Sequence, residues 1–240
     1  TGSNTARSSS NFYALNNCIA TLFEIRGVGI GKTSFKRRIN SGLAVGFSFL
    51  KTAYENSNFI FNQIDIANTY TNDIVLQHER SIYTDVIKAI DIESNELIDF
   101  STTMHSSKDS YAISKRDRPL AYIIKKNNYG FIEKLNDVGV NYVELEKDTM
   151  IYSGGYKVVE FNNKFKVYEK MKMQKVVTSI EYSNNKFSKG DILISMNQKR
   201  SNLIAELLEP EAPNSYVSFG IIKTSLNNQL PIYRIKNFNN

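Results

Sequence analysis

The chain has 240 residues, of which 41% are hydrophobic and 12% aromatic, and this composition excludes an intrinsically disordered protein. The formal net charge is +6, but the basic residues are spread along the chain and no nucleic-acid-binding motif accompanies them. The single cysteine, Cys18, excludes an internal disulfide and a cysteine-cluster metal site. No apolar run approaches the length of a membrane span. We therefore expect no nucleic-acid partner and no membrane partner.

The N-terminal quarter predicts a loop, a strand and a helix. Residues 1–14 are polar and predict the loop, and residues 18–25 (CIATLFEI) predict an apolar strand interrupted by one acid, Glu24. A glycine-rich turn over 27–31 follows. Thr33 or Ser34 could then cap a helix. Its apolar residues recur every three or four positions and form one stripe: Phe35, Ile39, Leu43, Phe47, Leu50 and Tyr54.

The remaining residues alternate between strand-like and short helical patterns. The expected elements are strands 72–92 and 97–104, a loop over 105–118, a strand–helix–strand unit over 120–124, 128–138 and 140–145, strand-like residues 151–182 with turns at 154–155 and 162–163, a strand over 192–196 and a helix over 202–208. The densest basic clusters, 36–38, 115–118 and 170–175, are interpreted as solvated faces.

The turn before the helix resembles a phosphate-binding loop, because Gly31-Lys32-Thr33 precedes the helix. A P-loop requires a glycine at position 26, where this chain has Arg26, and starting from Gly27 leaves the loop one residue short. We therefore disfavour nucleotide binding.

TLFEIRGVGIG (21–31), followed by Phe35 and Arg37-Arg38-Ile39, resembles the C-terminal end of the catalytic domain in the zinc carboxypeptidase (carboxypeptidase A-like) family. The upstream ARSSSNFYALNN is similar to the approach to that strand. RPLAYII (118–124), LNDVGVNYVEL (135–145) and LLEPEAPNSYVSFGII (207–222) are similar to the C-terminal extension of longer bacterial members. The resemblance implies an α/β fold: the edge of a mixed-sheet carboxypeptidase-like catalytic domain over 1–62, a linker over 63–71 and an α+β C-terminal extension over 72–240.

The resemblance also implies that Glu24 is the catalytic glutamate. An acid inside an apolar strand costs free energy unless it is paired or used. At the C-terminal end of a strand in an α/β sheet, its carboxylate would face the crevice where such folds place their chemistry. There it could take a proton from water and pass it to the leaving amine. The alternative is a structural Glu24 paired with Arg26 or with the basic residues of the following helix.

Zinc is the cofactor that the resemblance implies, but its ligands are not in this chain. The family's site needs His-x-x-Glu and a later His, all before the catalytic strand, whereas His78 and His105 both follow Glu24 and neither begins such a motif. The chain therefore holds half an active site and is expected to be inactive alone. We expect the C-terminal portion of a zinc-dependent metallocarboxypeptidase that hydrolyses C-terminal peptide bonds. Its expected partners are a peptide or peptide-like substrate and the missing N-terminal part of the catalytic domain.

A non-enzymatic binding or scaffolding module derived from that family is the alternative. In either case the extension, 72–240, holds no nucleophile–base pair at short range and no glycine-rich phosphate loop. We expect it to be a packing or recognition module that docks on the long helix, 34–56.

Overall fold

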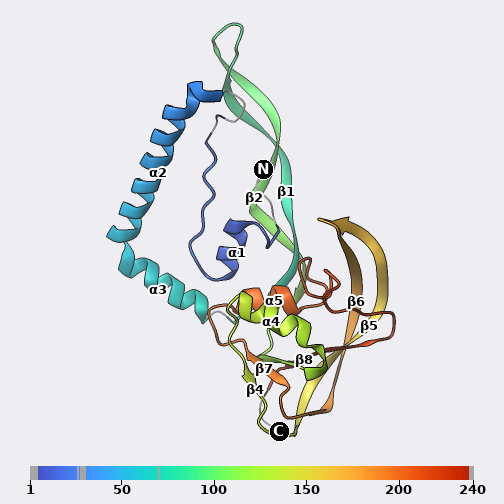
Figure 1. Ribbon diagram of the computed structural model, residues 1–240. Helices are drawn as coiled ribbons and strands as arrows, with labels where there is room; N and C mark the ends of the chain where they lie inside the picture. The colour runs from blue at the N-terminus through green and yellow to red at the C-terminus, as the bar shows by residue number, and fades with distance from the viewer. Residues whose placement is uncertain (1–4, 26, 28–30, 70, 238–240) are drawn as a thin grey trace.

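The computed structural model describes residues 5–25, 27, 31–69 and 71–237. It is a mixed structure of helices and antiparallel sheets. A compact C-terminal region carries a six-stranded sheet, and a long helix and a two-stranded ribbon extend from it (Figure 1). Within the described residues, no helix is both long enough and apolar enough to cross a membrane.

The N-terminal region is mostly helical. It contains α1 (Ser9–Leu15), the 3-10 turn η1 (Gly31–Ser34), α2 (Phe35–Glu55) and α3 (Ser57–Asn68). The long helix agrees with its apolar spacing. The loop expected over the first 14 residues instead contains α1, and α3 runs through residues 63–68 of the expected linker. Ser34 precedes α2, but its hydroxyl donates to the Gly27 carbonyl at 3.3 Å rather than capping the helix.

The strand expected over 18–25 does not form, because no strand among the described residues pairs with this segment. A strand is stable only when a neighbour satisfies its N–H and C=O groups. Arg26 and residues 28–30 lie outside the described residues, so the glycine turn and a Glu24–Arg26 pair are not described.

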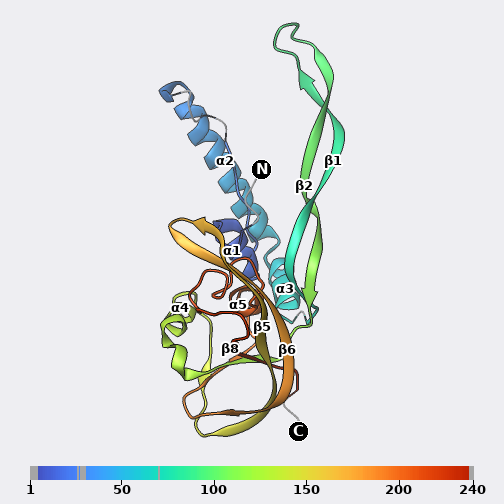
Figure 2. The same ribbon diagram turned by 90° about the vertical axis from the view of Figure 1, so that its right-hand side faces the viewer.

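The ribbon is an antiparallel pair of β1 (Ile74–Ile90) and β2 (Leu97–Arg116). Figure 2 shows it extending far from the C-terminal sheet. The loop expected over 105–118 is wrong, because β2 continues to Arg116 through register shifts between Val75 and Ser81. The polar residues of this stretch suit a ribbon exposed to water on both faces.

The C-terminal sheet is built from six antiparallel strands in the order β4-β7-β3-β8-β5-β6. In chain order, the strands of this sheet and the helices between them are β3 (Ala121–Ile124), η2 (Lys126–Phe131), α4 (Ile132–Asp137), β4 (Val143–Glu144), β5 (Thr149–Tyr168), β6 (Met171–Phe187), β7 (Ile192–Ser195), α5 (Ser201–Leu208) and β8 (Gln229–Ile235).

The C-terminal core lies mainly between this sheet and the helices α4 and α5. Tyr122 and Ile124 of β3 face Leu135 of α4 and Leu208 of α5, and all four are fully buried. The alternate residues of β3 face a second, smaller cluster that includes Phe187. This central strand is therefore buried on both faces, as its apolar sequence suggests.

The expected turns inside 151–182 are misplaced. Gly154 and Gly155 lie within β5, where a side chain on Gly155 would collide with Gln229. The chain reverses at Glu169 and Lys170 instead, and both have positive φ angles. These glycines therefore allow neighbouring strands to approach closely and do not form a turn.

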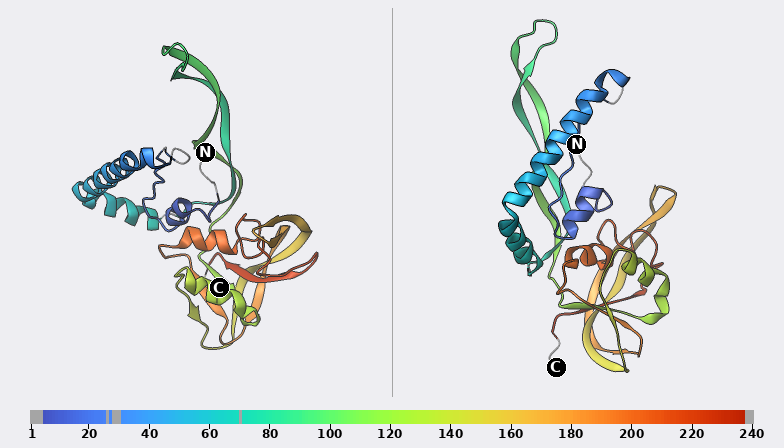
Figure 3. Two further views of the ribbon diagram at one scale, coloured as in Figure 1. Left: turned by 45° about the horizontal axis from the view of Figure 1, so that its top comes forward. Right: turned by 60° about the vertical axis from the view of Figure 1, so that its left-hand side comes forward.

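The apolar stripe of α2 remains exposed. Its six residues have exposed fractions between 46% (Ile39) and 83% (Tyr54). Figure 3 shows α2 directed away from the C-terminal sheet. The expectation that the extension docks on this helix is therefore wrong, and the extension holds α1 instead.

Candidate active-site segment

Glu24 lies on the irregular segment that joins α1 to α2. Its side chain is exposed, as are those of Leu22 and Phe23 beside it. Among the residues that the structure describes, the Glu24 carboxylate has no hydrogen-bond or ion-pair partner, and this includes the basic residues of α2.

One side of α2 holds the end of this segment. The rings of Phe23 and Phe49 meet edge to face with centroids 5.8 Å apart. Gly42 admits Ile25 close to the helix, and the Arg38 side chain covers Gly27. Gly27 has a φ of 154° and no room for a Cβ, which explains a glycine there. This side of α2 is distinct from the exposed stripe.

Asn17 holds the beginning of the segment. Its backbone has a φ of 52°, a conformation that asparagine tolerates better than most residues. Its side-chain amide donates to Asn68 Oδ1 at 2.9 Å and to the Lys199 carbonyl at 3.2 Å, and its Oδ1 accepts from Asn202 at 3.2 Å. Asn17 therefore links α1 to the end of α3 and to the start of α5.

Arg7 fixes the other end of α1. Its guanidinium lies 3.7 Å from the centroid of the Tyr168 ring, a cation–π geometry, and its Nε donates to Asn214 Oδ1 at 3.3 Å. An ion pair with Glu169 at 3.5 Å completes the contact. Residues of the C-terminal domain thus contact α1 at both ends. These contacts position the segment that contains Glu24.

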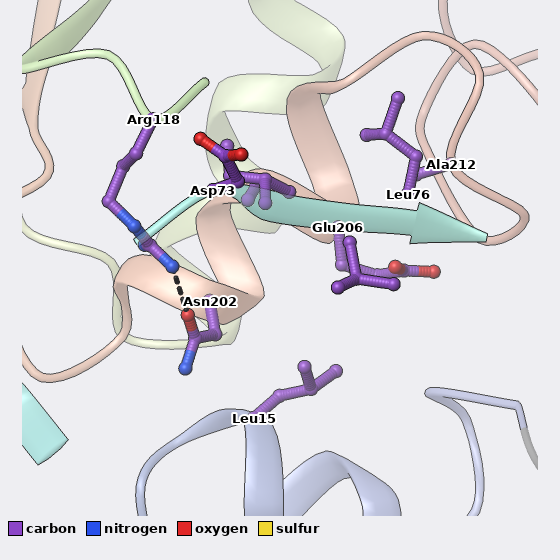
Figure 4. A pocket seen from close by; sticks show the side chains of 10 residues that line it. Leu15, Asp73, Leu76, Arg118, Asn202, Glu206 and Ala212 are labelled. Atoms are coloured by element: carbon purple, nitrogen blue, oxygen red, sulfur yellow. Dashed lines mark hydrogen bonds between the residues drawn. The ribbon is translucent and has the colours of Figure 1, made fainter. Parts of the chain in front are cut away.

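A pocket of about 230 Å³ lies in the same joint between α1, β1 and α5 (Figure 4). Arg118 enters it and donates to Asn202 Oδ1 at 2.7 Å and to the Asn72 carbonyl at 3.0 Å. Glu206 Oε1 accepts from the backbone and side-chain amides of Asn214, and burial raises the pKa of Glu206 above its ordinary value. Glu24 does not line this pocket.

A buried ionic cluster centres on Glu209, directly after α5. Its Oε1 accepts from the Tyr122 hydroxyl at 2.5 Å, and its Oε2 accepts from Arg116 at 2.6 Å. Arg234 Nε lies 3.3 Å away, within ion-pair range, and Arg116 also pairs with Glu211 at 2.7 Å. Burial and the neighbouring Glu209 hold the pKa of Tyr122 well above its ordinary value.

The sequence analysis did not predict this cluster, because it placed Glu209 only after a helix over 202–208 and within the run that resembles the extension. Two acids beside a proline in an apolar run, LLEPEAP, were the available signal. The basic cluster 115–118 is correspondingly not a solvated face, because Arg116 and Arg118 are both engaged in the domain. The clusters at 36–38 and 170–175 do carry mostly exposed basic side chains.

The described residues do not fit a zinc site. His78 pairs with Ala112 and His105 pairs with Ile82, so the two histidines are about 13 Å apart along the ribbon at the usual rise of a strand. Within the described part of the chain, no three His, Cys, Asp or Glu side chains are close enough together to hold a metal ion. A catalytic zinc needs three protein ligands within about 2.2 Å.

Comparison with known proteins connects the chain to carboxypeptidases. It is 30% identical over 240 residues to a carboxypeptidase 2 of Trichophyton equinum and equally so to one of Trichophyton rubrum, with 96% of this chain covered in each. A probable carboxypeptidase 2 of Trichophyton verrucosum is 28% identical over 213 residues. The alignments support a carboxypeptidase-like family, and these relatives are fungal.

The chain spans about 44% of the length of the first two relatives, and 40% of the third. No protein-family model matches the chain. No solved structure matches it either.

Proposed function

We propose that this chain is the C-terminal portion of a zinc-dependent metallocarboxypeptidase that hydrolyses the C-terminal bond of peptides or peptide-like substrates. The named activity of the relatives supports the reaction class. The zinc ligands and the residues that grip the substrate carboxylate would come from a longer polypeptide, from the region that precedes this chain. This chain alone would be inactive.

The observation that carries the proposal is the unpartnered surface around Glu24. Within the described part of the chain, the segment 18–25 pairs with no strand, and the stripe of α2 exposes six large apolar side chains. Large contiguous apolar surfaces on soluble proteins mark interfaces. A catalytic domain that pairs with the segment and covers the stripe would satisfy both features and would enclose Glu24.

Glu24 would act as the general base and acid of the reaction. Its carboxylate is exposed and free of partners among the described residues, so it could accept a proton from the attacking water and deliver it to the leaving amine. Arg7 and Asn17 would hold this segment at a fixed distance from the C-terminal domain. The domain's role would be mechanical support and not chemistry.

Replacing Glu24 in the longer polypeptide tests the proposal. Glu24→Gln keeps the size of the side chain but cannot accept a proton, so peptidase activity should fall by about 10²–10⁴-fold while zinc content and melting temperature stay unchanged. Glu55→Gln is the matched control, since Glu55 is an exposed acid at the end of α2 and should leave activity intact. Activity of Glu24→Gln within a fewfold of the wild type would make Glu24 structural.

A further inference from the structure

The ribbon β1–β2 has two chemically different faces. Directly opposed residues of an antiparallel pair project to the same face, and successive residues project to opposite faces. On one face the opposed pairs are Ser81–Ser106, Tyr83–Met104, Asp85–Thr102, Ile87–Phe100 and Ala89–Ile98. Two of these five pairs are wholly apolar and Tyr83–Met104 is largely so, and we name this the apolar face.

The other face, the mixed face, is suited to water over most of its length. Its pairs are Ile82–His105, Thr84–Thr103, Val86–Ser101, Lys88–Asp99 and Ile90–Leu97. Lys88 and Asp99 form an ion pair, and only the pair nearest the turn is wholly apolar. Alternation of this kind is typical of a sheet with one face packed and one face solvated.

The described chain does not cover the apolar face. Ile87 is 41% exposed and its partner Phe100 is 52% exposed. The ribbon is anchored at its base, where Ile74 and Leu76 are buried in the C-terminal core and Arg116 reaches Glu209. An isolated two-stranded ribbon is only marginally stable in water, so the outer part of this one requires a further packing partner.

We propose that the apolar face of the ribbon packs against the same body that completes the Glu24 segment, namely the part of the longer polypeptide outside this chain. This rests on the proposed function for the identity of that body. The relatives have more than half of their length outside the matched region, which is enough for a domain. The ribbon and α2 extend from the same end of the C-terminal domain (Figures 1 and 2).

A second copy of this chain is the competing occupant. Pairing of two ribbons would cover the apolar face, but it would leave the α2 stripe and the segment 18–25 without partners. One body in contact with the ribbon, α2 and the segment 18–25 would account for all three surfaces. The ribbon then acts as an arm that fixes the position of the catalytic domain relative to the C-terminal domain.

Photo-cross-linking in the longer polypeptide tests this assignment. The cross-linking residue p-benzoylphenylalanine replaces Ile87 in one protein and its neighbour Val86 in the other, so that the two probes differ only in the face they occupy. After irradiation, mass spectrometry identifies the attached peptide. We expect position 87 to cross-link to residues outside this chain within the same polypeptide, and position 86 to yield at least about tenfold less product.

Several results would overturn the proposal. These are a cross-linked dimer of two copies from position 87, equal yields from both positions, or no product from either in a protein with intact ribbon hydrogen exchange. If the probe at 87 prevents folding, a probe at Phe100 reports on the same face against a control at Ser101. Peptidase activity of the unmodified protein is measured separately, so an inactive protein with the expected cross-link would refute the function but not the arm.

Discussion

Two helices of this molecule, α2 and α5, are both amphipathic, yet only one has buried its apolar side. In α5, Leu203, Ile204 and Leu208 pack into the core of the C-terminal domain. In α2, the corresponding stripe is exposed along its whole length. Amphipathic spacing thus shows which side of a helix requires a partner, but not whether the partner lies in the same stretch of chain.

The same contrast separates two apolar extended segments. The strand β3 pairs with β7 on one side and β8 on the other, and all four of its residues are buried. The segment 18–25 has a comparable apolar sequence but pairs with no strand among the described residues, and it stays irregular. The six-stranded sheet and its helices therefore bury their own apolar side chains, whereas α2 and the segment 18–25 leave theirs exposed.

A large effect is expected in the ionic cluster of the C-terminal domain. Glu209→Gln removes the charge that Arg116 and Arg234 share in the buried interior. Breaking a buried charge pair typically costs about 3–5 kcal/mol, and urea unfolding of the domain should show a loss near the lower limit because Glu211 and Asp117 remain. Glu181→Gln, at an exposed position on β6, is the control. Equal stabilities for the two variants would contradict a structural role for the cluster.

Identical truncations in the two helices compare the regions directly. Leu208→Ala should destabilise the chain by about 2–5 kcal/mol because a fully buried leucine leaves a cavity. Leu50→Ala, at a position that is 66% exposed, should change the unfolding free energy by less than about 0.5 kcal/mol. In the longer polypeptide, Leu50→Ala should lower the free energy of unfolding, because the stripe is covered there. A cost at Leu50 in this chain matching that at Leu208 would show that α2 is already packed.

A smaller, local effect is expected at the joint that holds α1. Asn17→Gly keeps the backbone freedom that a φ of 52° demands but removes the side-chain bonds to Asn68, Lys199 and Asn202. Each bond contributes roughly 1 kcal/mol, so amide exchange in α1 should accelerate while exchange in α5 does not. Asn95→Gly is the control. Asn95 also has a positive φ, but its side chain is exposed in the ribbon turn, so its removal should leave α1 unaffected. Unchanged exchange in α1 would mean that Asn17 does not hold it.

The smallest effect is a pH-dependent one at Glu206. Because burial raises the pKa of Glu206, the folded state holds this proton to higher pH than the unfolded chain does. The ionisation of Glu206 therefore lowers the free energy of unfolding as the pH rises above the ordinary carboxyl range. Glu206→Gln should raise the melting temperature at about pH 7, and the gain should vanish near about pH 4. A gain that is independent of pH, or a loss at neutral pH, would contradict this ionisation.

Much of the C-terminal domain could be predicted from local sequence, since β3, β7 and α5 all appear where apolar runs place them. The length of β2 could not be predicted from the sequence. Its polar residues 105–116 favour a loop, and they form a strand only because they pair with β1. The catalytic role of Glu24 is a prediction that rests mainly on the resemblance, and the geometry of the described residues does not test it. Arg7 and Asn17 were not identified, because their partners Tyr168, Lys199 and Asn202 are more than 150 positions away in the chain.

Hydrogen exchange in α2 tests most directly whether the N-terminal region is one side of an interface. The amides of Phe35–Glu55 are compared between this chain alone and the longer polypeptide, with the amides of α5 as an internal reference. We predict that burial of the stripe slows exchange in α2 by about tenfold or more, equivalent to about 1.4 kcal/mol, and leaves α5 unchanged. Equal exchange of α2 in the two proteins would contradict the account.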